Sequence, residues 1–171
     1  MKNCYIEYSK YLLKHKFYVT LECFKIGLFW RGLKHDMSKF LPSEFIPYAR
    51  FFYGQGKKER DKIRNKTGYY KPHDTGDEKF DYAWLHHVRN NDHHWQFYCM
   101  PKDADVGGIK IYEMPKNAVF EMMCDWIGAS KAQKAGSVTN WYKQNGKKLI
   151  LDEKARIIIE TEVQYGMLKN R

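Results

Sequence analysis

Apolar side chains recur at helical spacing near the start of the chain, and this periodicity restrains the fold more than any other feature. The spaced residues are Tyr8, Leu12, Val19, Cys23 and Ile26. Because an α-helix turns once every 3.6 residues, they fall close to one face of a helix. We therefore expect helix over residues 5–34, with a break near Gly27 or Gly32, where glycine weakens the helix.

The rest of the chain shows similar patterning. Further helices are expected over residues 43–52, 80–98, 115–129 and 152–168, the last with Asp152 as a plausible N-cap. Glycine and proline mark loops over 54–79 and 100–114, and 130–149 is expected to be irregular. No segment alternates at period two for long enough to require a sheet. The sequence predicts an all-α fold with long irregular loops, in one domain over 1–171.

The chain is strongly basic. Its 171 residues carry a formal net charge of +10, which favours an anionic partner such as a nucleotide or nucleic acid, although a solvated basic surface is the simpler alternative. The 54–79 loop is a candidate flap over an anionic ligand. It holds many of the cations, namely Lys57, Lys58, Arg60, Lys62, Arg64, Lys66 and Lys71.

Cysteine usage and hydropathy indicate the compartment. The four cysteines form no CxxC pair, and Cys23 and Cys124 resemble small core residues. The first ten residues are too polar for a signal peptide, and no apolar run approaches the ~20 residues that span a membrane. We expect a protein of a reducing cytoplasm, with no membrane partner.

Histidines are the most informative polar residues. His15 shares the stripe of the first helix, since His15, Val19 and Cys23 are each four apart, and His35 is followed directly by Asp36. Four more lie within nine residues: His86, His87, His93 and His94.

On the expected helix 80–98, residues seven apart lie on nearly the same face. His87 would then stack below His94, and His86 below His93. Imidazole is the commonest metal ligand near neutral pH, so this face is a candidate metal site. The alternative for any one histidine is a surface position or a satisfied place in the core.

Glu121 and Asp125 are four apart in an otherwise apolar segment. A buried carboxylate requires a partner, a proton or a metal ion. A salt bridge to lysine or arginine is the alternative to a metal.

The order of these residues resembles the HD-domain superfamily of metal-dependent phosphohydrolases. In that family one histidine lies on an early helix, a His-Asp doublet ends the next helix, and an aspartate follows at a distance. The resemblance implies that His15, His35, Asp36 and Asp125 bind metal within a compact HD-like helical bundle.

Members with two metals add histidines between the doublet and the last aspartate. His87 and His94 fit that role, with His86 and His93 as alternates. The run from His35 to Lys39 also resembles the HDxGK motif of the family's cyclic-dinucleotide phosphodiesterases, with Ser38 in place of glycine. No Gly-Tyr-Pro motif follows the histidine cluster, in contrast to those enzymes.

The resemblance implies one or two divalent ions of Mn, Fe, Co or Zn, since imidazole and carboxylate suit these metals. Asp36 would bridge two ions, Lys39 would hold a substrate phosphate, and Glu121 would orient a water or a ligand histidine. Other candidate substrate contacts are Lys34, Arg89, Asn90 and Trp95, with Trp84, Tyr98 and Trp126 as further stacking surfaces.

A second resemblance covers most of the chain. The runs GLKHDMSKF (32–40), NDHHW (91–95) and EMMCDW (121–126) are similar to a family of bacterial and phage proteins known as a domain of unknown function. This likeness implies that the motifs form one unit, in a bacterial cell or a phage-infected host. It also makes destruction of a host nucleotide immune signal a conceivable role.

Three functions stay open on the sequence alone. The preferred one is hydrolysis of a nucleotide, a cyclic nucleotide or a cyclic dinucleotide. The same ligands would serve an HD-type di-iron oxygenase. A basic protein that binds or sequesters nucleic acid or nucleotides, with a structural metal, is the third.

Overall fold

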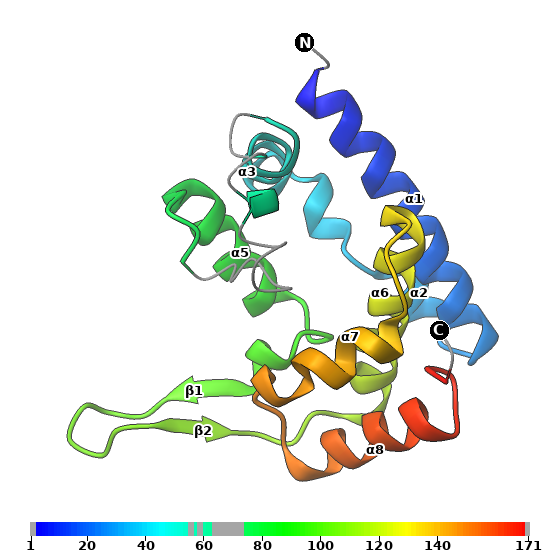
Figure 1. Cartoon of the computed structure of the whole chain (residues 1–171). Coiled ribbons are helices and arrows are strands. Elements are labelled where there is room, and N and C mark those ends of the chain that lie inside the picture. Colours follow the sequence, from blue (N-terminus) through cyan, green and yellow to red (C-terminus); the bar gives the residue numbers. More distant parts are fainter. Residues whose placement is uncertain (1–2, 55–56, 58–59, 63–73, 170–171) are drawn as a thin grey trace. The chain divides into compact units, whose positions relative to one another are not determined.

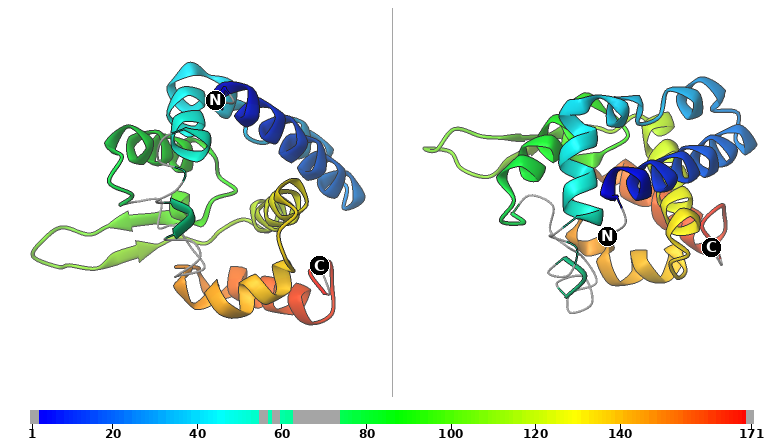
Figure 2. Two further views of the ribbon diagram at one scale, coloured as in Figure 1. Left: turned by 45° about the horizontal axis from the view of Figure 1, so that its top comes forward. Right: turned by 90° about the horizontal axis from the view of Figure 1, so that it is seen from above.

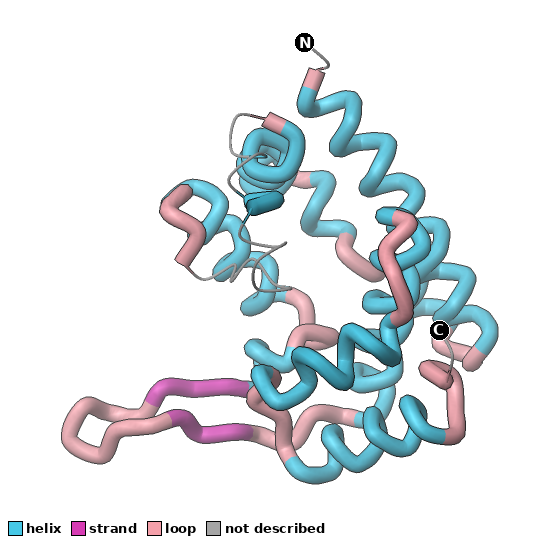
Figure 3. Tube along the Cα trace, in the orientation of Figure 1, coloured by secondary structure: helices cyan, strands magenta, loops and turns pink. Residues whose placement is uncertain are grey.

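The structure is a computed structural model and describes residues 3–54, 57, 60–62 and 74–169. Over these residues the chain is mainly helical, which confirms the predicted fold class (Figure 3). It divides into two compact units, each built from separate stretches of sequence. Unit 1 comprises Met1–Lys14 and Asp36–Asn90, and unit 2 comprises His15–His35 and Asn91–Arg171. The single domain predicted for residues 1–171 stays a prediction.

Unit 1 is built around an aromatic core. It contains the first part of α1 (Cys4–Lys25), the 3-10 turn η1 (Met37–Phe40), α3 (Pro42–Tyr53) and α5 (Glu78–Asn90). The buried apolar residues are Tyr8, Leu12, Tyr48, Ala49, Phe51, Phe80 and Ala83. The rings of Phe51 and Phe80 stack with centroids 3.9 Å apart, which joins α3 to α5.

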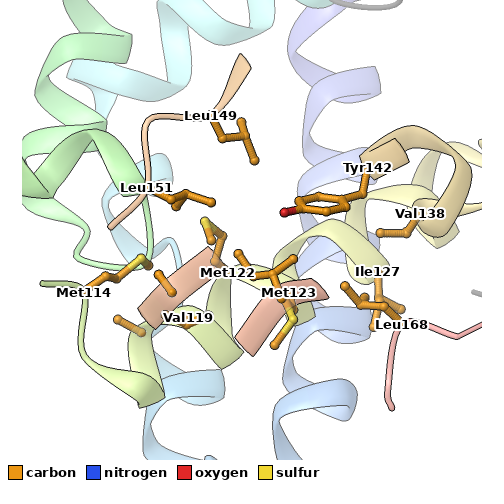
Figure 4. Packing of buried hydrophobic residues seen from close by; sticks show 13 residues of the cluster. Met114, Val119, Met122, Met123, Ile127, Val138, Tyr142, Leu149, Leu151 and Leu168 are labelled. Carbon is orange, nitrogen blue, oxygen red and sulfur yellow. The ribbon is translucent and has the colours of Figure 1, made fainter. Parts of the chain in front are cut away.

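Unit 2 holds the remainder of α1 and most of the later helices (Figure 1). In chain order they are α2 (Phe29–Lys34), the 3-10 turn η2 (Trp95–Tyr98), α6 (Lys116–Gln133), α7 (Val138–Asn145), the 3-10 turn η3 (Gly146–Lys148) and α8 (Glu153–Gln164). Their core is aliphatic and methionine-rich (Figure 4). Met122 and Met123 of α6 are buried in it beside Ile159 of α8.

The predicted helix boundaries are confirmed where local signals are strong. The N-terminal helix breaks at Gly27, whose φ of +77° lies in the left-handed region that glycine adopts without strain. Asp152 caps α8, because its carboxylate accepts a hydrogen bond from the Ala155 backbone N–H at 3.1 Å. Cys23 and Cys124 are buried in the core, as expected.

Several predicted segments differ from the structure. The expected helix 80–98 ends at Asn90, and the 130–149 segment contains α7. The predicted loop 100–114 carries part of an antiparallel hairpin, in which β1 (Cys99–Pro101) pairs with β2 (Ile109–Ile111). The hairpin projects from the rest of unit 2 in both views of Figure 2.

Residues 57 and 60–62 are helical where a basic loop was predicted. Four other basic residues of the candidate flap, Lys58, Arg64, Lys66 and Lys71, lie outside the described residues. Among the helices that the structure describes, none combines the length and the hydropathy required to cross a bilayer.

Candidate metal centre

Unit 2 brings His15, His35 and Asp125 together. His15 comes from α1, His35 directly follows α2, and Asp125 lies on α6. His15 Nε2 lies 3.1 Å from Asp125 Oδ1, and His35 Nε2 lies 3.5 Å from the same oxygen. Both histidines are 2% exposed. Two imidazoles and a carboxylate therefore converge on one point. The binding of a metal ion by these three residues stays a prediction.

The position of His35 is fixed from the neighbouring turn of α1. Lys16 Nζ donates hydrogen bonds to the carbonyl oxygens of Leu33 and His35, both at 2.6 Å. These bonds satisfy carbonyls at the end of α2 that have no partner within the helix. Gly32 lets α2 approach α1 closely, since a Cβ there would lie 2.8 Å from Cys23 Cβ.

Glu121 orients His35 from the other side of the ring. His35 Nδ1 lies 2.9 Å from Glu121 Oε1, and Arg31 Nε donates to Glu121 Oε2 at 2.5 Å. Arg31 also donates to Asp92 through Nη2. A carboxylate on Nδ1 fixes the tautomer in which Nε2 presents its lone pair. The predicted role of Glu121 in orienting a ligand histidine stays a prediction that this geometry supports.

The electrostatics keep both carboxylates charged. Burial raises the pKa of Glu121, but the hydrogen bond with His35 and the charges of His93, His35 and Arg31 outweigh burial and lower it. Burial likewise raises the pKa of Asp125, and hydrogen bonds with His15 and His35 hold it well below its usual value. An ionised carboxylate beside two imidazoles is the state that binds a metal cation.

His93 and His94 extend this cluster in unit 2. The rings of His93 and His35 lie 4.3 Å apart, and His93 Nδ1 lies 3.4 Å from Glu121 Oε1. The His94 ring lies 4.2 Å from that of His93. His93, predicted as an alternate, is 2% exposed, whereas His94 is half-buried.

Unit 1 repeats the arrangement around His87. His87 Nε2 lies 3.2 Å from Asp36 Oδ1, while its Nδ1 lies 2.9 Å from Glu44 Oε2. Glu44 is fully buried, and its Oε2 also accepts a hydrogen bond from Ser38 Oγ at 3.0 Å. Asp36 adopts a left-handed conformation with φ of +54°, which aspartate tolerates better than most residues. His87 and His35 thus each present Nδ1 to a buried glutamate and Nε2 to an aspartate.

Glu44 also has a depressed pKa. Burial raises the pKa of Glu44, but hydrogen bonds with His87, His86 and Ser38 and the charge on His87 outweigh burial and lower the pKa below its usual value. Its Oε1 lies 2.7 Å from His86 Nδ1. His86, the other alternate, has a side chain 44% exposed and is held at the edge of the cluster.

The predicted substrate contacts are more scattered. Lys39 Nζ donates to Asp36 Oδ2 at 2.5 Å within unit 1. Lys34 in unit 2 and Arg89 in unit 1 are exposed, and the Asn90 side chain donates to the His86 carbonyl oxygen. Trp95 is partly buried against the core of unit 2.

The expected stacking of His87 below His94 on one helix is wrong. The α-helix ends at Asn90, and His94 N–H bonds the Asn91 carbonyl oxygen in a turn instead. Asparagine and aspartate at 90–92 compete with the helical backbone for hydrogen bonds, which favours termination.

The residues that support the histidines are not indicated by any pattern in the sequence. Glu44, Arg31 and Lys16 have no spacing signal, because their partners lie 43, 90 and 19 positions away. Ser38, noted for replacing a glycine, in fact bonds Glu44.

A mainly helical protein with buried imidazole–carboxylate clusters is a candidate metalloprotein, since these groups could hold a metal ion. Comparison with family models places the chain in a family of unknown function (DUF5662), whose model matches residues 4–164. No curated protein and no solved structure matches the chain.

Proposed function

We propose that the protein is a metal-dependent phosphohydrolase that acts on a nucleotide or cyclic nucleotide. The observation that carries the proposal is the convergence of His15 Nε2 and His35 Nε2 on Asp125 Oδ1, with His35 Nδ1 bonded to Glu121. The resemblance to the HD superfamily supplies the reaction class.

The donor set of unit 2 fits a transition metal. One ligand atom from each of His15, His35 and Asp125 lies within 4.8 Å of the others. Two imidazoles and one carboxylate suit Mn²⁺, Fe²⁺, Co²⁺ or Zn²⁺ better than Ca²⁺ or Mg²⁺. Three protein ligands would leave positions for water or substrate, as in catalytic zinc sites. Asp36 and His87 are a further donor pair, in unit 1.

A bound metal of this kind lowers the pKa of water towards neutrality and polarises a phosphoryl group. The chain's own residues prepare the site for it. Glu121 accepts a hydrogen bond from His35 Nδ1–H, and Arg31 neutralises part of the charge on Glu121. Glu44 likewise accepts a hydrogen bond from Nδ1 of His87. Lys39 is the candidate phosphate contact and is held by Asp36.

A substrate screen tests the proposal. Metal-loaded protein is incubated with nucleoside phosphates, cyclic mononucleotides and cyclic dinucleotides in the presence of Mn²⁺, and the products are separated by chromatography. We expect turnover of one class, and its loss on chelation and in a His35→Ala/Asp36→Ala double variant. Turnover that survives both treatments, or none across the panel with metal bound, would contradict the proposal.

The net charge of +10 favours a second candidate, a nucleotide- or nucleic-acid-binding protein with a structural metal. That function predicts binding that weakens steeply with salt and no turnover. The screen therefore separates the two candidates. The di-iron oxygenase shares its ligands with the hydrolase, and an oxygen-dependent absorption band after loading with Fe²⁺ would favour it.

A further inference from the structure

A cavity lies within unit 2, among residues of α7, η3, α8 and the segment after α8. Its volume is about 560 Å³, within the ~300–1,000 Å³ typical of small-molecule sites. None of its lining residues is a candidate metal ligand, so it is independent of the proposed hydrolase site.

The cavity is lined by cations from separate parts of the unit. Lys143 of α7, Lys147 of η3, Arg156 of α8 and Lys169 contribute positive charge, and among the described lining residues Glu160 is the single carboxylate. Such an excess of cations in a concave site concentrates anions.

The wall that carries Lys147 is held in place by the cavity's own residues. Arg156 donates to the carbonyl oxygens of Leu149 and Gly146, at 2.8 and 3.3 Å, which ties α8 to η3. Gly146 packs on the Tyr142 ring so closely that a Cβ there would lie 2.9 Å from Tyr142 Cζ. Tyr142 is itself part of the core (Figure 4).

The hydrogen-bond acceptors of the lining complement a different kind of group. Glu160 and Gln164 are four apart on α8, so they share a face of that helix. Both can accept hydrogen bonds from hydroxyl or amino groups. Thr139 and Val163 add a mixed surface beside them.

We propose that this cavity binds a small phosphate-bearing molecule of nucleotide size. Lys143, Lys147 and Lys169 contact its phosphate groups, and Glu160 with Gln164 receives its sugar or base donors. The site is an accessory anion pocket, and it shares no residue with the candidate metal cluster.

Calorimetric titration of the full chain tests the proposal, with ATP, AMP and inorganic pyrophosphate as probes and no divalent metal present. The pocket variant is Lys143→Glu/Lys147→Glu. The matched control is Lys102→Glu/Lys110→Glu, which makes the same charge change at exposed hairpin positions. Thermal melts of all proteins verify that they are folded.

We expect ATP affinity to fall by at least about tenfold in the pocket variant, equivalent to ~1.4 kcal/mol, and by less than about twofold in the control. An Asp125→Ala variant should bind ATP as the wild type does, since Asp125 is outside the cavity. The proposal is overturned if the wild type binds no probe, if both double variants weaken equally, or if Asp125→Ala abolishes binding.

Discussion

The imidazole of His35 has a different acidic partner on each nitrogen. Glu121 is bonded to Nδ1, while Nε2 is directed at Asp125. His87 has the same pair of partners in Glu44 and Asp36. Because a carboxylate on Nδ1 fixes both the tautomer and the ring orientation, Glu121 and Glu44 are expected to act on metal affinity through the histidines.

Replacement of Glu121 by glutamine tests this positioning role. The substitution removes the charge that His35 and Arg31 bind, so we expect metal affinity to fall by roughly 10–100-fold. The measurement is a competition titration with a chromophoric chelator. The control, Glu113→Gln, removes an exposed carboxylate that pairs with Lys154. Equal affinity in Glu121→Gln and wild type would show that Glu121 does not support the ligand.

At the scale of elements, α1 and α6 approach closely within unit 2, and this contact positions two of the candidate ligands. His15 and Val19 lie on α1, while Asp125 and Gly128 lie on α6. A Cβ at Gly128 would lie 2.9 Å from the Val19 backbone nitrogen, closer than real Cβ atoms approach. The absence of a side chain at Gly128 therefore permits the spacing of the two helices.

Gly128→Ala should force the helices apart. We expect it to destabilise the protein by about 1–3 kcal/mol in urea unfolding, despite the better helix propensity of alanine. Gly136→Ala is the control, because nothing lies within 4 Å of a Cβ there, and its effect should stay within about 0.5 kcal/mol. A neutral Gly128→Ala would contradict the close contact.

Buried Glu22 provides a second connection between these helices. It accepts hydrogen bonds from Lys131 of α6 at 2.5 Å and Lys25 of α1 at 2.7 Å. Burial raises the pKa of Glu22, but these lysines outweigh burial and lower it below its usual value. A depressed pKa in the folded state stabilises the fold above the unfolded pKa of about 4.3, and this is lost as pH falls through the folded value.

Glu22→Gln should therefore be less stable than wild type by about 1–3 kcal/mol at pH 7, since it loses charge-assisted hydrogen bonds. The difference should shrink as pH falls below about 4. Urea unfolding of both proteins at several pH values measures it. A difference that stays constant from pH 7 to pH 3 would rule out the ionised carboxylate as its source.

Elements with strong local signals could be predicted from sequence. The stripe from Tyr8 to Ile26 gave the first helix, and Gly27 marked its end because the turn requires a positive φ. Asp152 marked the start of α8 through its side-chain cap. The end of α5 at Asn90 was missed, since the apolar pattern continues into Trp95 while the polar residues between them break the helix.

The candidate ligands were easier to predict than their supports. Histidine occurs only seven times in the chain and is a common metal ligand, so His15 and His35 are conspicuous, and Asp125 stands out in an otherwise apolar segment. Glu44 is one of many acidic residues on helices, and its burial depends on α3 packing against α5 in unit 1. Such long-range pairing leaves no periodic signal.

At the scale of the whole molecule, the chain passes between the two units after Lys14, His35 and Asn90. Three candidate ligands lie next to the first two of these boundaries in the sequence. They are His15, His35 and Asp36. The contacts of His35 with Lys16 and Glu121 are long-range in sequence. The net charge of +10 favours a general attraction for anions.

The most direct test of the metal centre is elemental analysis of untagged protein purified without added metal. Wild type is compared with Asp125→Ala and with Asp105→Ala, a control at an exposed hairpin position. We expect a transition metal in wild type and in Asp105→Ala, and its loss in Asp125→Ala. The same metal content in all three proteins, or none in wild type even after soaking with Mn²⁺, Fe²⁺, Co²⁺ or Zn²⁺, would contradict it.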